Sequence, residues 1–429
     1  MNRYKQFVFE NYNFDIETKT LTLDYSLDES LHFTEIFTFD FDYAQPLNPD
    51  LLDIACQTVF FIAGVSYYKT YLPPEIVVRK GQIDQQTADF LSKTYQKGLG
   101  EFFYVNNLDP HTPVIFPITT AGITVPEFAQ LPDGKLVGIG GGKDSLLSIE
   151  LLRDESNIST WSVGHKQQLM PLVERIGLEH YWVERSWDKN LLELNKLDAY
   201  NGHIPISAIF AAVGVLTAVL SGKRDVVVSN ESSANESNLT YRGIAINHQY
   251  SKSLEFEQDF QTYLSHRLKG AVRYYSLLRP FSELKIAKFF AKTGLEKYRD
   301  VFSSCNRAFT HASDHIFWCG ECPKCAFVFL ALTPFVKRDQ LEKLFGKNLS
   351  LDPKLEPTYR QLLGIEGDKP MECVGEIKES RAAMRMAQQQ YPELMKYVFE
   401  LPADYNYSSL SPHAMPAEIF KTLELIVIG

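Results

Sequence analysis

The sequence has little positive charge for its length. Its 429 residues include 43 Lys and Arg and 53 Asp and Glu, which gives a formal net charge of −10 at pH 7, and no cluster holds five or more basic residues. Proteins that bind nucleic acid mainly through its phosphates usually have a basic surface. The charge pattern therefore predicts a protein without a nucleic-acid partner.

Long hydrophobic runs are also scarce. The N-terminal sequence MNRYKQFVFENYNFD has early charges and lacks the apolar core of a signal peptide. Residues 204–220 are uncharged, but this stretch is at the short limit for a membrane-spanning helix and contains Pro205, Ser207 and Thr217. We expect it to be a helix packed against a sheet, in a cytoplasmic protein with no membrane partner.

Cysteine is rare, with six residues in the chain, and four of the six lie between residues 305 and 325. This distribution is not typical of secreted disulfide frameworks and favours the reducing cytoplasm. The Cys-x-x-Cys spacing that begins at residue 319 is the usual half of a zinc knuckle. Buried free thiols and redox or catalytic thiols are the alternatives to a structural Zn²⁺ held by Cys305, Cys319, Cys322 and Cys325.

The hydrophobic pattern changes along the chain. In residues 1–45 aromatic and β-branched residues recur at every second position, which is typical of an antiparallel meander. Helical stretches and a proline-punctuated segment follow, so we expect residues 1–132 to form an α+β domain. Residues 133–300 alternate apolar strands with helices, which predicts a parallel sheet with crossover helices and hence an α/β fold. Residues 301–429 are expected to form a helical, cysteine-containing region, in which residues 421–429 have the composition of a last strand.

A glycine-rich loop follows the first strand of the predicted parallel sheet. Residues 136–145 read LVGIGGGKDS, and a helical segment comes next. Glycine lets the backbone approach a ligand closely, and the N–H groups that open a helix attract anions. The spacing fits neither GxxxxGK[ST] nor GxGxxG. It resembles SGGxDS, the pyrophosphatase (PP) loop of enzymes that split ATP into AMP and pyrophosphate. We predict that the ATP phosphates are bound by Gly140, which replaces the usual Ser, and by Gly141, Gly142, Lys143, Asp144 and Ser145.

Polar residues also follow the later strands of the predicted sheet. Ser162 and Gly164 lie at the end of the second strand, and Asn230 follows the fourth. Because ligands bind outside the carboxyl ends of parallel strands, we expect these three residues to contact the nucleotide. The carboxylates of Asp144 and Glu231 are candidate ligands for the Mg²⁺ that accompanies ATP.

The chain as a whole resembles the ATP-dependent UDP-N-acetyl-α-D-muramoyl-L-alanyl-L-glutamate epimerase family of peptidoglycan synthesis. The resemblance implies a PP-loop (HUP-like) domain in residues 133–300, ATP and Mg²⁺ as cofactors, and a UDP-linked muramoyl dipeptide as the small-molecule substrate. The implied reaction inverts the terminal L-glutamate to D-glutamate through an acyl-adenylate and releases AMP and pyrophosphate. The segments that carry the resemblance are IAGVSYYK (62–69), GLGEFFY (98–104), GIGGGKDS (138–145), NESSANESN (230–238) and WCGECPKC (318–325).

Adenylation explains why such an epimerase needs ATP. The α-hydrogen beside a free carboxylate is very weakly acidic, because the enolate would carry a second negative charge next to the first. Conversion of the carboxylate to a mixed anhydride removes that first charge. The proton can then be taken and returned by general bases and acids on opposite faces of Cα. The candidates for these roles are His165, Glu231 and the cysteine group.

Other functions are compatible with the same loop. An adenylating amide or nitrile synthetase, or a sulfur-transfer enzyme, would pass the activated group to a nucleophile. A binding protein with a degenerate loop would hold nucleotide without turnover, since Gly140 lacks the hydroxyl of the usual Ser. Release of AMP and pyrophosphate with the muramoyl dipeptide, and without an added amine, would indicate the epimerase. The sequence leaves the oligomeric state open.

Overall fold

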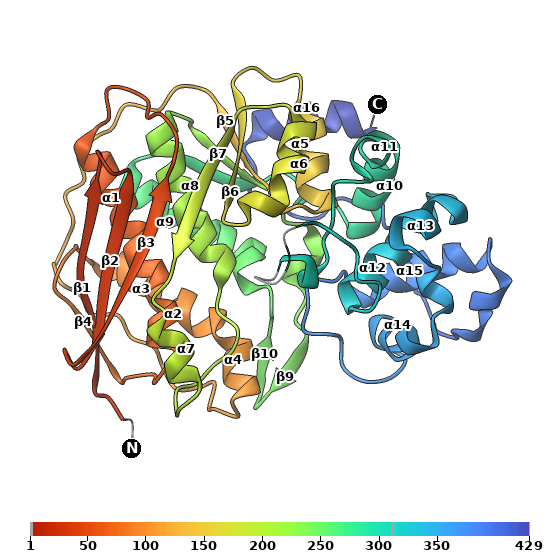
Figure 1. Cartoon of the computed structure of the whole chain (residues 1–429), viewed down its shortest axis with the longest axis horizontal. Helices are drawn as coiled ribbons and strands as arrows, with labels where there is room; N and C mark the ends of the chain where they lie inside the picture. The colour runs from red at the N-terminus through yellow and green to blue at the C-terminus, as the bar shows by residue number, and fades with distance from the viewer. Residues whose placement is uncertain (1–2, 310–312, 314, 429) are drawn as a thin grey trace.

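The computed structural model describes residues 3–309, 313 and 315–428, and these residues are organised around one nine-stranded sheet (Figure 1). The strand order is β11-β8-β5-β6-β7-β3-β2-β1-β4. The strands are β1 (Gln6–Asp15), β2 (Thr20–Leu27), β3 (Leu31–Phe39), β4 (Glu75–Val78), β5 (Lys135–Gly138), β6 (Ile158–Val163), β7 (His180–Ser186), β8 (Asp225–Val228) and β11 (Arg273–Ser276). A separate hairpin pairs β9 (Leu239–Tyr241) with β10 (Ile244–Ile246).

Five neighbouring strands, from β11 to β7, run parallel to one another. Leu136 and Val226 pack into one apolar core, whereas their chain neighbours Val137 and Val227 pack into a second core on the opposite face. These strands are therefore continuous apolar runs, because helices cover both faces of the sheet. The connecting helices include α5 (Lys143–Leu152), α6 (Lys166–Ile176), α7 (Asn190–Asn195), α8 (Ile206–Ser221) and α9 (Leu254–Leu268). The predicted α/β fold is confirmed.

The N-terminal strands β1, β2 and β3 form the predicted antiparallel meander. Strand β3 also pairs antiparallel with β7, which places Phe37 opposite Arg185, so the sheet continues across residue 132. At this junction Arg185 donates from Nε to Oε1 of the fully buried Glu35 at 2.6 Å. The meander thus extends the parallel sheet. The division of the chain into folding units at residues 132 and 300 stays a prediction.

Two apolar helical segments pack against each other in the N-terminal half. The segment Pro49–Tyr68 comprises α1 (Pro49–Ala63) and α2 (Val65–Tyr68), and it is long and apolar enough to cross a membrane. However, 89% of its most apolar window is buried inside the protein, as expected for a core helix. Helix α8, the stretch expected to lie against the sheet, packs against α1. Two further helices are α3 (Gln85–Gly98) and α4 (Gly100–Val105), and residues 110–132, all of which are described, contain no helix or strand.

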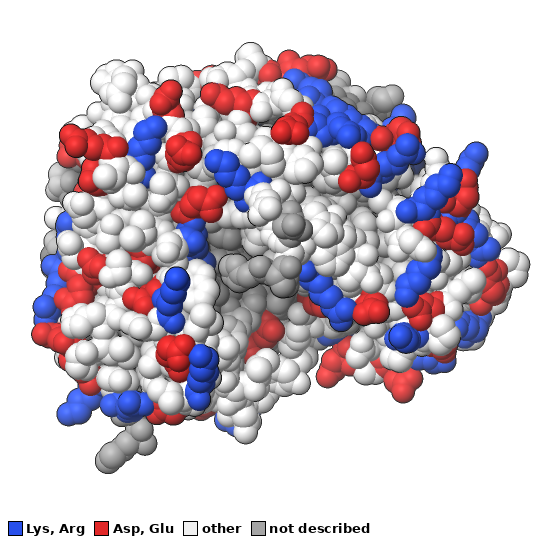
Figure 2. Space-filling model, viewed as in Figure 1, with Lys and Arg blue, Asp and Glu red and all other residues white. Residues whose placement is uncertain are grey.

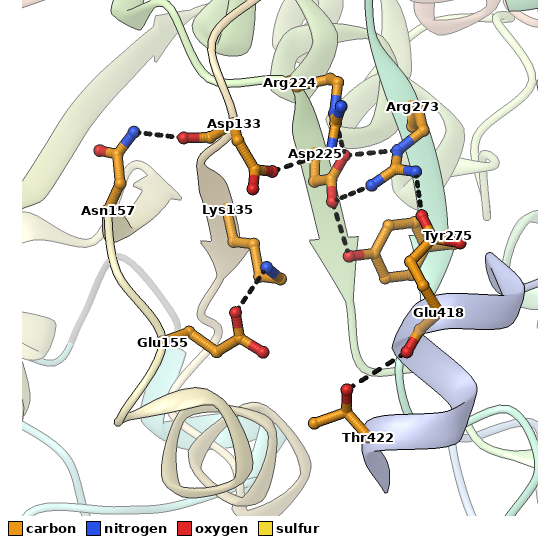
Figure 3. A network of polar contacts seen from close by, with 10 residues as sticks. All are labelled: Asp133, Lys135, Glu155, Asn157, Arg224, Asp225, Arg273, Tyr275, Glu418 and Thr422. Atoms are coloured by element: carbon orange, nitrogen blue, oxygen red, sulfur yellow. Dashed lines mark hydrogen bonds and ion pairs between the residues drawn. The ribbon is translucent and has the colours of Figure 1, made fainter.

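A charged network joins the amino ends of the parallel strands (Figure 3). The fully buried carboxylate of Asp225 accepts hydrogen bonds from Nε and Nη2 of Arg273, both at 2.7 Å, and from the hydroxyl of Tyr275 at 3.0 Å. Arg273 also donates to Glu418 of the last helix at 2.6 Å. Because a buried carboxylate is tolerated only when it is paired, this network holds β8, β11 and the C-terminal helix in register. Its role is structural.

The C-terminal part of the chain is helical, as predicted, with one error. The expected strand in residues 421–429 is wrong, because residues up to 428 belong to helix α16. Ile419 and Leu423 are buried four positions apart, as required on one face of a helix, whereas Leu425 is exposed. Gly429 lies outside the described residues. The helices are α10 (Glu283–Thr293), α11 (Leu295–Tyr298), α12 (Pro323–Leu332), α13 (Arg338–Phe345), α14 (Glu356–Leu362), α15 (Ile377–Gln388) and α16 (Ala417–Ile428).

Candidate active site

A cavity of ≈ 420 Å³ lies at the carboxyl ends of β5, β6 and β8, where open parallel sheets bind their ligands. Figure 2 shows the molecule hollowed between its N-terminal half and the C-terminal helices, with acidic and basic side chains intermingled over this face. The cavity is lined by the glycine loop, by α8 and by segments of the C-terminal region. The residues on which the site argument depends are Gly140, Gly142, Asp144, Ser145, Ser162, His165, Asn230, Lys252, Ser304, Phe309, Lys324 and Cys373.

The glycine loop links β5 to α5 in the predicted strand–loop–helix arrangement. Gly141 has a φ of +87°, and a Cβ there would lie 2.6 Å from Cζ of Phe309, so the position requires glycine. A Cβ on Gly142, the residue before α5, would lie 2.6 Å from Oγ of Ser304. A Cβ on Gly140 meets no atom of the described residues within 4 Å. The space for the Ser of the related loop is therefore open at residue 140.

Lys143, which was predicted to bind phosphate, is buried beside the cavity and pairs with a residue of its lining, Asp144. Its side chain is 2% exposed, and its ammonium forms ion pairs with Asp144 and with the equally buried Glu283. The hydroxyl of Ser145 donates to the carbonyl of Gly142 at 3.1 Å, which closes the first turn of α5. Asp144 and Ser145 line the cavity, whereas Lys143 is not among the described residues that do so. The contact between Lys143 and phosphate therefore stays a prediction.

Three carboxylates gather beside the loop. Oxygens of Asp144, Glu231 and Glu283 lie within 4.8 Å of one another. Burial, with the nearby carboxylates of Asp144 and Glu231, raises the pKa of Glu283 to about 7 against the opposing charge of Lys143. Glu231 is 6% exposed and does not belong to the described cavity lining, so it faces this cluster. The ammonium of Lys143 offsets the charge of two of these carboxylates, and the three oxygen donors fit a hard cation such as Mg²⁺. Glu283 was missed because it opens a helix far away in the sequence.

The other strand-end residues are distributed around the same edge of the sheet. Ser162 and Asn230 line the cavity, and Ser162 Oγ is 3.1 Å from Nε2 of His180. His165 also lines the cavity, at the start of α6, with its ring centroid 5.5 Å from that of Phe309. Gly164 turns the chain after β6 with a φ of +66° and lies outside the described cavity lining. The structure therefore brings His165 and the loop to one cavity.

The four clustered cysteines converge, with their sulfurs within 4.8 Å of one another. The Sγ–Sγ distances are 3.9 Å for Cys305–Cys322, 3.7 Å for Cys319–Cys325 and 3.4 Å for Cys322–Cys325. A tetrahedral Zn²⁺ with bonds of about 2.3 Å would place its sulfurs roughly 3.8 Å apart. The geometry fits a structural zinc. The same segment contributes Ser304 and Lys324 to the cavity wall, so the cluster supports that wall.

Three charged or reactive cavity residues, Lys252, Lys324 and Cys373, were missed in the sequence. Lys252 ends a short 3₁₀ helix, and its Nζ lies 3.0 Å from Sγ of Cys373 in the segment between α14 and α15. Lys324 donates from Nζ to the backbone carbonyl of Cys373. Burial alone would raise the pKa of the Cys373 thiol, but the charge of Lys252 and a hydrogen bond with His248 outweigh burial and lower it to about 5. An isolated cysteine and an isolated lysine form no motif, so only the fold relates them.

His248 belongs to a polar group that contacts Cys373. Its Nδ1 contacts the carboxylate of Glu101, and Nδ1 of His203 lies 3.5 Å from the same carboxylate. Burial alone would lower the pKa of His248, but hydrogen bonds with Cys373 and Glu101 raise it to about 9. His248 is therefore protonated at neutral pH and presents a second positive charge to the sulfur.

Comparisons with known proteins identify the family of this chain. Residues 1–277 match the MurL N-terminal domain, and residues 301–403 match the MurL C-terminal domain. A protein from Xanthomonas oryzae pv. oryzae named UDP-N-acetyl-alpha-D-muramoyl-L-alanyl-L-glutamate epimerase is 41% identical over 86% of this chain and 83% of its own length. Proteins of the same name from Salinispora tropica and Micromonospora sp. are 39% and 37% identical, each over 91% of this chain and over 86% and 88% of their own lengths. With both domains matched and relatives this similar along most of its length, the chain belongs to the MurL family of epimerases.

Proposed function

We propose that this protein is an ATP- and Mg²⁺-dependent epimerase of the cytoplasm. It inverts the terminal L-glutamate of UDP-N-acetylmuramoyl-L-alanyl-L-glutamate through an acyl-adenylate, with AMP and pyrophosphate as products, in peptidoglycan precursor synthesis. The observation that carries the proposal is that two sets of residues line one cavity. The first set is the glycine loop, which is of the phosphate-binding type, and the second set is Lys252, Lys324 and Cys373.

The loop side supplies phosphate binding. Backbone N–H groups from Gly140 to Ser145 and the start of α5 can hold the ATP phosphates, since a helix N-terminus favours anions. Donors already aimed at the departing pyrophosphate stabilise the charge that develops there. Asp144, Glu231 and Glu283 would hold a Mg²⁺, which would supply neutralising positive charge.

Proton transfer at Cα requires groups on both faces of the activated glutamyl residue. His165 lines the cavity next to the loop and remains a candidate for one face. Glu231 was the second candidate, but its place beside Asp144 and Glu283 suits the cation better than Cα. The cysteine cluster would serve as a structural Zn²⁺ site, because its sulfurs are spaced like ligands of a tetrahedral metal.

Incubation of the full chain with ATP, Mg²⁺ and the UDP-linked L-Ala-L-Glu dipeptide in deuterated water tests the proposal. The expected products are AMP, pyrophosphate and a dipeptide whose glutamate is D-configured and carries deuterium at Cα. Without ATP, neither inversion nor label should occur. Inversion at the full rate without ATP contradicts the adenylate route. ATP cleavage without label indicates a synthetase, which passes the activated carboxyl to a nucleophile and leaves Cα untouched.

A further inference from the structure

Cys373 differs from the other cysteines in its surroundings. It lies outside the four-cysteine cluster, lines the same cavity as the glycine loop, and has Nζ of Lys252 at 3.0 Å from its sulfur. Cys56 is a useful contrast, because it is 1% exposed in an apolar core, and burial and the charge of Asp53 raise its pKa. A thiol flanked by cations at a cavity wall is in the environment of a reactive cysteine.

We propose that the thiolate of Cys373 is the base that removes the α-hydrogen of the activated glutamyl residue on one face of Cα. This inference rests on the proposed function and adds a catalytic residue to it. The Cα–H bond breaks, an S–H bond forms, and the electron pair moves into the enolate of the acyl-adenylate. A proton from an acid on the opposite face then forms the new Cα–H bond. Both groups return to their starting states by proton exchange with water.

Several contacts favour a base at this sulfur. The ammonium of Lys252 stabilises the thiolate. Against the effect of burial, the charges of Asp144 and Glu231 act on the same ammonium and raise its pKa. The thiolate therefore lies within electrostatic range of the loop that would hold the activating phosphates. Lys324 fixes the backbone of Cys373 through its carbonyl, so the sulfur is held at the wall. Lys252 and Lys324 act as positioning residues.

The pair of His248 and Glu101 also supports the assignment of Cys373 as the base. His248 is held by Glu101 and contacts Cys373, so a protonated imidazole lies beside the sulfur. A general base must be unprotonated at the working pH. A thiolate that is stabilised at neutral pH meets this requirement without a neighbouring group to deprotonate it. A cysteine with only a packing role would need neither the two cations nor a place on the cavity wall.

Two activities of the Cys373→Ser variant are measured separately: AMP formation, which reports adenylation of the glutamyl carboxylate, and inversion, which reports proton transfer at Cα. We expect this variant to keep dipeptide-dependent AMP formation near the wild-type rate. Its inversion should fall by about 100-fold or more, the usual loss when a general base is removed. Matched Cys56→Ser should retain both activities, and circular dichroism checks the fold of each variant. Inversion by Cys373→Ser at close to the wild-type rate overturns the proposal. Loss of AMP formation by a folded variant also overturns it, because Cys373 would then serve activation or binding.

A second measurement uses the wild-type protein and so does not depend on a variant that folds. Iodoacetamide should alkylate Cys373 faster than Cys56, and inversion should disappear in step with that labelling, as followed by peptide mass spectrometry. ATP with the dipeptide should slow the labelling of Cys373. Full alkylation of Cys373 with undiminished inversion overturns the proposal. Absence of ATP-dependent inversion in the unmodified wild-type protein would instead refute the proposed function itself.

Discussion

The ammonium nitrogen of Lys252 lies 3.0 Å from the sulfur of Cys373, although 121 positions separate the two residues in the sequence. Both residues line the cavity at the carboxyl ends of the parallel strands. Their contact joins a short helix of the α/β part to a loop of the C-terminal region, so neither region alone contains this part of the site.

The pH dependence of thiol reactivity tests this contact. Because the pKa of Cys373 is lowered to about 5, its rate of alkylation by iodoacetamide should rise as pH increases through 5 and level off above it. Below that pH the sulfur is protonated and unreactive. The charged groups that face it are Lys252, His248, Lys324 and Glu372. Lys252→Met should move the midpoint upward, whereas a wild-type midpoint near the ordinary thiol value of about 8.5 would contradict the arrangement.

Asp144 is expected to be essential for nucleotide chemistry. Asp144→Asn removes one of three clustered carboxylates at the phosphate loop and should lower AMP formation by roughly 100-fold, while the fold is retained. Ser145→Ala tests the neighbouring cavity residue in the same assay and should also lower AMP formation. Asp154→Asn is the matched control, because Asp154 is exposed just beyond α5. Near-normal AMP formation by both loop variants would refute the assignment of the loop.

The glycines of the loop should respond unequally to substitution. Gly141→Ala places a Cβ on a residue with φ of +87° and 2.6 Å from Phe309, so we expect a loss of about 1–2 kcal/mol in the free energy of unfolding. Gly140→Ser has open space among the described residues and should leave stability unchanged. Urea unfolding of the two variants provides the measurement. Equal destabilisation would show that the loop has a different backbone conformation.

The four-cysteine cluster predicts bound zinc. Protein purified without chelators should contain close to one Zn²⁺ per chain by elemental mass spectrometry, and Cys322→Ser should lose it. A metal present at a thousand times its dissociation constant stabilises the fold by about 4 kcal/mol, so the melting temperature should fall with the metal. Cys56→Ser, which changes a buried cysteine elsewhere, should keep its zinc. Metal-free wild-type protein of unchanged stability would favour buried free thiols instead.

The features predicted from the sequence are local ones. Gly141 and Gly142 are consecutive, and Cys319, Cys322 and Cys325 are each three positions apart, so covalent connectivity already brings each set together. Alternation of apolar strands and helices likewise predicted a parallel sheet, because each element's period is a property of its own residues. These patterns were sufficient for the α/β fold, the loop and the cysteine cluster.

Tertiary packing alone decided the rest. Lys143 follows the glycines as a phosphate-binding lysine would, and only the fold shows that its buried ammonium pairs with Glu283 from a distant helix. The tail that was expected to be a strand belongs to α16, and the helical face that carries Leu423 is buried against the protein. Cys373 and Lys252 carry no signal in the sequence, since ionic contacts between distant segments depend on how the helices and the sheet pack. The sequence thus determined the local elements, and packing determined which charges meet in the cavity.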